Sequence, residues 1–197
     1  MIVWPHAASA QDAGNPREAS PIKTTLMWLG GGLAGLGIHE SGHVVTSGLF
    51  GAEPSIRAIR SGPIPFFAIT HRNGVPDSQE ALISGAGFLS QHVTSEIVLS
   101  RRATGDSVSA FEKGLLGFHV ATSAAYAGAA FARYGPHERD TRGIADATHT
   151  DERVIGALVL APAAFDTWRY FRPESKVARW GSRLSKVAFL GVILFKP

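Results

Sequence analysis

The sequence predicts an all-α membrane protein with about four transmembrane or partly inserted helices and a short β-prone segment after the first. Apolar stretches of helical length recur along the chain, and short basic or proline-rich connectors separate them. The first of these stretches, residues 24–52, contains only three ionisable side chains. A helix needs about 20 residues to cross the hydrocarbon core of a bilayer, so this stretch is long enough to span one with some tilt.

The composition limits the chemistry that the chain can perform. Its 197 residues are enough for one ordinary domain. The absence of cysteine excludes disulfides and thiolate metal sites, so a metal would be bound by His, Asp, Glu or backbone oxygen. The net charge of +3 does not favour a nucleic-acid partner, and basic residues gather in short runs, as at residues 101–102 and 169–179. Such runs are typical of loops beside a membrane.

The N-terminal region differs in composition from the rest of the chain. We expect residues 1–22 to be a flexible tail or the remnant of a signal peptide, and residues 23–197 to form one membrane-embedded domain. Ala8-Ser9-Ala10 has the small-x-small form of a signal-peptidase site, although a chance alanine-rich terminus would look the same. The polar residues that follow it, with two prolines, predict a flexible chain.

The first apolar stretch, residues 24–52, is rich in glycine. It contains eight glycines, and Gly31 and Gly35 among them are four positions apart. In water so many glycines would weaken a helix, whereas in a membrane they let neighbouring helices approach closely. We therefore predict a first membrane helix here, and the core helix of a soluble protein remains the alternative.

The later elements are less regular. Prolines interrupt residues 53–77, where the aromatic segment 64–69 predicts an edge strand or a hairpin arm. Further apolar stretches with helical potential follow, at residues 81–100, 108–132, 154–165 and 187–195. The last of these, residues 187–195, is too short to span a bilayer alone. Residues 136–153 are expected to form a charged connector.

The strongest chemical signal is the motif His39-Glu40-Ser41-Gly42-His43. On a helix, residues four apart share a face, so both imidazoles can reach one Zn²⁺ at roughly 2.0–2.1 Å. Glu40 lies beside the first ligand, where it can accept a proton from a zinc-bound water, whose pKa falls to about 7. The motif predicts a zinc hydrolase in which Glu40 is the general base and later the proton donor to the leaving amine.

The position of this motif strengthens the prediction. A charged group inside a membrane segment costs about 2.5–3.5 kcal/mol on insertion scales, and a bound metal would compensate three such groups within five positions. A buried, hydrogen-bonded His–Glu cluster is the alternative.

Zinc also requires a third protein ligand. Spacing does not choose among the candidates, which are Asp140, Asp146, Asp151, Asp166, Glu96, His92, His119 and His137. From local sequence alone, Asp140 is better interpreted as a solvated charge or a helix cap.

Three segments resemble the site-2 protease family of intramembrane zinc metalloproteases. These are the motif region 37–45, the proline-rich β-prone stretch up to Phe67, and Gly87-Phe-Leu-Ser-Gln91, where the family tends to have Gly-Pro-Leu-x-Asn. The family's third ligand is an aspartate about a hundred residues after the motif glutamate. The resemblance therefore implies Asp140 as the third ligand, with Asp146 in reserve, although neither is followed by the family's usual glycine. It also implies that Gln91 binds the substrate or the developing oxyanion.

The resemblance implies a zinc-dependent endopeptidase that hydrolyses membrane proteins or peptides within or at the edge of the lipid bilayer. We expect a multi-pass integral protein of the bacterial inner (cell) membrane, without a nucleic-acid partner. Three alternatives remain open. The chain could be a catalytically inactive membrane scaffold or metal-binding relative, a soluble or peripheral metallohydrolase, or a transporter-like protein with a His/Glu ion site.

Overall fold

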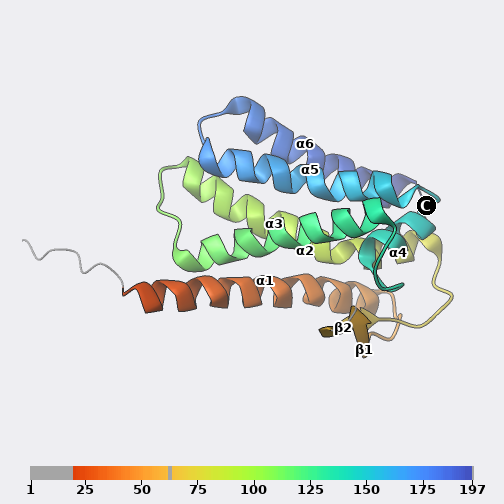
Figure 1. Cartoon of the computed structure of the whole chain (residues 1–197). Coiled ribbons are helices and arrows are strands. Elements are labelled where there is room, and N and C mark those ends of the chain that lie inside the picture. Colours follow the sequence, from red (N-terminus) through yellow and green to blue (C-terminus); the bar gives the residue numbers. More distant parts are fainter. Residues whose placement is uncertain (1–19, 62–63, 197) are drawn as a thin grey trace, which may run out of the picture.

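The computed structural model describes residues 20–61 and 64–196, and its fold in these ranges is mostly helical (Figure 1). The elements are α1 (Pro21–Leu49), β1 (Ser55–Ser61), β2 (Ile64–Thr70), α2 (Asp77–Ala103), α3 (Ala110–Ala132), α4 (Asp140–Ala147), α5 (Glu152–Phe171) and α6 (Lys176–Phe195). The predicted helical class is therefore confirmed. The predicted tail and the Ala8-Ser9-Ala10 site lie outside the described residues, except that residues 21 and 22 already belong to α1.

The last two helices of the chain are longer than the apolar stretches that predicted them. α5 continues through Pro162, which removes one backbone donor from the helix without ending it. α6 begins eleven residues before the run 187–195, where Ser175 caps the helix by accepting a hydrogen bond from the backbone N–H of Ala178. The supposed connector 136–153 contains a further helix, α4.

The β-prone segment forms one arm of an antiparallel hairpin. Strands β1 and β2 pair from Ser55 opposite Thr70 to Ser61 opposite Ile64. The backbone N–H of Arg72 donates to the carbonyl of Ala52, which ties the end of the hairpin to the turn that follows α1. The hairpin consequently lies beside the C-terminal part of α1 (Figure 1).

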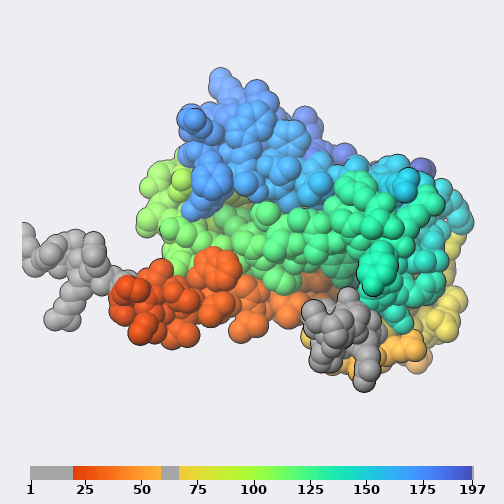
Figure 2. Space-filling model, in the orientation of Figure 1, coloured from red at the N-terminus to blue at the C-terminus, as the bar shows by residue number. Residues whose placement is uncertain are grey.

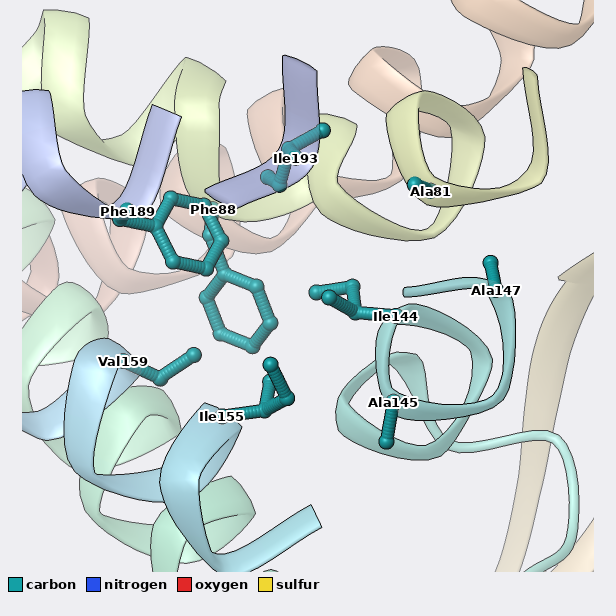
Figure 3. Packing of buried hydrophobic residues seen from close by; sticks show 9 residues of the cluster. All are labelled: Ala81, Phe88, Ile144, Ala145, Ala147, Ile155, Val159, Phe189 and Ile193. Atoms are coloured by element: carbon teal, nitrogen blue, oxygen red, sulfur yellow. The ribbon is translucent and has the colours of Figure 1, made fainter. Parts of the chain in front are cut away.

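The long helices form a layered bundle. α1 packs against α2 and α3, α3 packs against α5, and α5 packs against α6 (Figure 1). The main hydrophobic cluster joins α2, α4, α5 and α6, with Phe88 and Phe189 edge to face at a ring-centroid distance of 5.8 Å (Figure 3). Ile144 brings α4 into this cluster, and it is fully buried. The core therefore fixes α4, the short helix that carries Asp140.

Close contact between α1 and α3 depends on glycine. A Cβ added at Gly31 would lie 2.0 Å from the carbonyl oxygen of Phe111, and one at Gly114 would lie 2.0 Å from that of Trp28. A Cβ at Gly35 would lie 2.9 Å from the Cβ of Phe118. The expectation that Gly31 and Gly35 allow close helix packing is therefore confirmed.

We expect Gly31→Ala to destabilise the protein by about 1–3 kcal/mol, because the added methyl group forces the α1 and α3 backbones apart. Thermal unfolding in detergent would measure this loss. Gly30→Ala is the matched control, since a Cβ at Gly30 has no atom within 4 Å. If both variants melt at the same temperature, the close approach of α1 and α3 is wrong.

One helix in the described part of the chain, α3, is long and apolar enough to cross a membrane by length and composition. The expectation of about four spans is therefore not matched by this criterion, because polar or charged side chains interrupt the other long helices. Large apolar side chains are nevertheless exposed on the outside of the bundle. They gather on α1, whose first turns form an outer edge of the molecule (Figure 2), and on α6, and they include Ile22, Leu26, Leu33, Val45, Val177, Trp180, Leu184 and Val187.

Candidate metal centre

Three side chains from two distant parts of the chain converge beside α2. The Nε2 atom of His39 lies 3.0 Å from Oδ2 of Asp140, and that of His43 lies 3.4 Å from the same oxygen. The two Nε2 atoms are themselves 3.4 Å apart. His39 and His43 are buried, and Asp140 is nearly so. Among the described residues, these three form the one group of His, Asp or Glu donors close enough to share a metal ion.

The triangle of donor atoms has the size that a metal requires. Ligands at 2.0–2.1 Å from a tetrahedral zinc lie about 3.3 Å from one another. The three separations in the protein are 3.0, 3.4 and 3.4 Å, so an ion could bind with small movements of the side chains. Two imidazoles and one carboxylate also suit zinc chemically, with a fourth position left for water or substrate. The donor set therefore fits a divalent zinc-like ion.

The protein orients His43 for this role. Its Nδ1 donates a hydrogen bond of 2.7 Å to the backbone carbonyl of Ile83. Since a carbonyl only accepts, this bond places a proton on Nδ1, so Nε2 is the nitrogen that faces His39 and Asp140 and that a metal would bind after losing its own proton. A backbone partner of this kind is common behind metal-binding histidines, where it fixes the ring and its tautomer.

His39 is fixed mainly by packing. Its ring lies edge to face against Phe88 at 5.4 Å and against Phe118 at 6.4 Å. The backbone of α2 passes close to the Nε2 edges of both imidazoles, because a Cβ at Gly87 would lie 2.6 Å from both Nε2 atoms. Gly87 therefore leaves the room in which His39 and His43 meet.

Asp140 is the first residue of α4. Its interpretation from local sequence, as a solvated charge or a helix cap, is wrong. The residue is neither a solvated charge nor the helix cap, since Arg139 occupies the N-cap position. Burial alone would raise the pKa of Asp140, but the charge of His43 and hydrogen bonds with both imidazoles outweigh burial and lower the pKa. The carboxylate is therefore ionised, as metal binding requires. Asp146, the reserve candidate, is instead largely exposed and pairs with Arg142.

Two further side chains lie near the triangle. Glu40 is half-buried on α1, directly after His39, and it interacts electrostatically with His39, His43 and Asp140. The ring of Tyr126 on α3 lies 6.1 Å from that of His39 and 5.2 Å from that of Phe88, measured between centroids. Sequence reasoning missed Tyr126, because a tyrosine in an apolar helix has no local feature that marks it.

The remaining ligand candidates lie elsewhere. Asp151 caps α5, and His137 is exposed. Four candidates belong instead to a separate polar network between α2, α3, α5 and α6. They are His92, Glu96, His119 and Asp166, and Arg169 and Lys186 complete the network. Ion pairs with Arg169 and Lys186 occupy the carboxylates of this network.

Gln91 makes no hydrogen bond to His39, His43 or Asp140 in the described structure. Its side chain is buried one helical turn after Gly87, and neither amide atom has a hydrogen-bond partner in the described structure. It lines a small cavity with Ser95, Phe118 and His119. No contact with the three donors is found for it among the described residues, so its expected role with the substrate stays a prediction.

A surface groove of about 430 Å³ runs between α1 and α2 beside the motif. Its walls include Ser41 and Gly42 of the motif, and the apolar side chains Ile38, Val45 and Leu89. An apolar peptide segment could therefore lie against the helix that carries both histidines.

No family model, curated protein or solved structure matches the chain. The resemblance to site-2 proteases therefore rests on the motif residues themselves, and it stays a prediction.

Proposed function

We propose that the protein is a zinc-dependent endopeptidase that hydrolyses peptide bonds of membrane-associated substrates, in the manner of the site-2 protease family. One observation carries the proposal. His39, His43 and Asp140 converge on a point that suits a single metal ion, and Glu40, which follows His39 on the same helix, interacts electrostatically with all three. A general base next to such a donor set is the arrangement that metal-assisted hydrolysis requires.

The chemistry divides between the ion and the protein. A bound divalent ion would supply the Lewis acidity that makes water a nucleophile near neutral pH. Glu40 takes a proton from the attacking water as its oxygen bonds to the scissile carbonyl carbon. The same carboxyl group then gives that proton to the amide nitrogen as the C–N bond breaks, so that a carboxylic acid and an amine leave. His39 is held in place by packing against Phe88, and His43 by its hydrogen bond to the carbonyl of Ile83.

The substrate would be an extended, apolar peptide. The carbonyls of an intact helix are already hydrogen-bonded, so a helical substrate must unwind before its backbone can be cut. The groove between α1 and α2 offers apolar walls to such a segment. The two-stranded hairpin next to α1 offers strand edges to which an extended peptide can add.

The membrane part of the proposal rests on the surface of the bundle. α3 is apolar enough to span, and α1 and α6 expose many large apolar side chains. Contiguous exposed apolar surface indicates a membrane or a protein partner. We favour the membrane, because such side chains occur along the length of α1 from Ile22 to Leu49.

We expect the protein to stay in the pellet when membranes are extracted with alkaline carbonate, which releases peripheral proteins. Immunoblotting of pellet and supernatant would measure this, with a known peripheral protein of the same membranes as the control. Release into the supernatant would exclude an integral protein and would favour the soluble or peripheral metallohydrolase.

The hydrolysis itself is tested with purified, zinc-loaded protein in detergent and a panel of single-span peptides that carry a fluorophore and a quencher. Cleavage that needs Glu40 supports the proposal, and no cleavage of any peptide argues against it.

A catalytically inactive, metal-binding relative is the second candidate. The replacement of the family's usual asparagine by Gln91, whose amide makes no hydrogen bond in the described structure, favours it.

A further inference from the structure

We infer that Glu152 is a positioning residue that holds the third metal ligand, Asp140, in place from outside the centre. The inference rests on the proposed metal centre. Asp140 stands between Arg139 and Thr141, and the side chains of both neighbours bind Glu152. Arg139 donates from Nε and Nη2 to the two carboxylate oxygens, at 2.6 Å each, and the hydroxyl of Thr141 donates to Oε1 at 2.9 Å.

These contacts are buried and form one unit. The side chains of Arg139 and Glu152 are 7% and 11% exposed, and Thr141 is fully buried. Nη1 of Arg139 also donates to the carbonyl of Pro136 at 2.8 Å. Through Arg139, Glu152 therefore ties the loop before α4 to the first turn of α5. A bidentate Arg–carboxylate pair restricts orientation as well as distance.

The direction of the Asp140 carboxylate depends on this unit. The later residues of α4 are anchored by the hydrophobic core through Ile144, Ala145 and Ala147. The first turn lacks this support, and no side chain caps it. A helix end without a cap frays easily, and fraying here would move Asp140 away from His39 and His43. Glu152 thus fixes the backbone on both sides of the one ligand that comes from another part of the chain.

A second Arg–Glu pair in the protein, in which only the arginine is buried, shows what a merely structural role would look like. Glu96 accepts hydrogen bonds from both terminal nitrogens of Arg169, at 2.5 and 3.1 Å, and Arg169 is buried. Neither residue of this pair is next to a proposed metal ligand in the sequence. Glu96→Gln therefore removes a comparable charge from the bundle without touching the surroundings of Asp140.

The test compares Zn²⁺ affinity, the absorption spectrum of the Co²⁺-loaded protein and thermal unfolding of the metal-free protein. For Glu152→Gln we expect affinity to fall by about 10–100-fold, as is usual when a partner behind a ligand is removed. The ligand-field bands of bound Co²⁺ should shift, since they report the geometry of the ligands. For Glu96→Gln we expect a lower melting temperature, with the affinity and the spectrum of the wild type.

Thr141→Val and Thr141→Ser provide a gentler comparison if Glu152→Gln does not fold. The valine variant loses only the hydroxyl group that donates a hydrogen bond to Glu152, so we expect it to bind Zn²⁺ several-fold more weakly. The serine variant keeps the hydroxyl and should bind Zn²⁺ like the wild type. Equal affinity and equal spectra for all variants would overturn the inference while leaving the metal centre intact. A wild type that takes up no Zn²⁺ would overturn both the centre and the inference.

Discussion

Replacing Glu40 with glutamine should abolish peptide hydrolysis while the protein keeps its zinc. The carboxamide has nearly the shape of the carboxylate, but it cannot take a proton from water. A positioned general base contributes typically 10²–10⁴-fold, so we expect the cleavage rate to fall by at least about 100-fold. The measurement pairs the rate of cleavage of a quenched peptide with zinc content per protein. Zinc content should not change, because Glu40 is not among the three converging donors.

Glu53→Gln is a suitable control for Glu40→Gln. It makes the same chemical change at an exposed residue after α1, outside both the converging donors and the lining of the groove between α1 and α2. This substitution should leave both cleavage and zinc content unchanged. A Glu40→Gln protein that cleaves at the wild-type rate would rule out the proposed mechanism, whatever its zinc content.

The long helices could be predicted because their signals are local. Apolar length and glycine spacing indicated α1, α2 and α3 to within a few residues. α4 was missed because its stability is tertiary. Its eight residues are too few to form a helix alone, and they are held by the burial of Ile144 and Ala145 against other helices. The first half of α6 was missed because it is polar, with Arg179 and Arg183 among its residues.

The residues of the candidate site also divide into those that a local pattern predicts and those that only tertiary packing brings together. His39, Glu40 and His43 lie within one helical turn, so their spacing alone brings them together. Asp140 is 101 positions from His39, and no periodic pattern extends across that distance. It was predicted through resemblance, against the local interpretation of its sequence. The contacts of Gly87, Tyr126 and Glu152 with this site depend on how α2, α3 and α5 pack, and no sequence pattern shows that packing.

Asp140→Ala should remove the metal from the protein. The substitution deletes one of three donors and leaves two imidazoles on one helix. Removing a partner that only orients a ligand typically costs 10–100-fold in affinity, so loss of the ligand itself should cost more than about 100-fold. Zinc content after dialysis, and the Kd from competition with a chelator, would measure this loss. Hydrolysis should disappear with the metal.

Asp146→Ala is the matched control for this loss, because both aspartates belong to α4 and only Asp140 faces the imidazoles. Asp146 is exposed and pairs with Arg142 at 3.4 Å, so its removal should leave zinc content unchanged. If Asp140→Ala kept its zinc while Asp146→Ala lost it, the ligand would be the exposed aspartate, and α4 would have to turn to present it. Turning α4 would break the contacts of Arg139 and Thr141 with Glu152 and lift Ile144 from the core, so the packing of the helix itself favours Asp140.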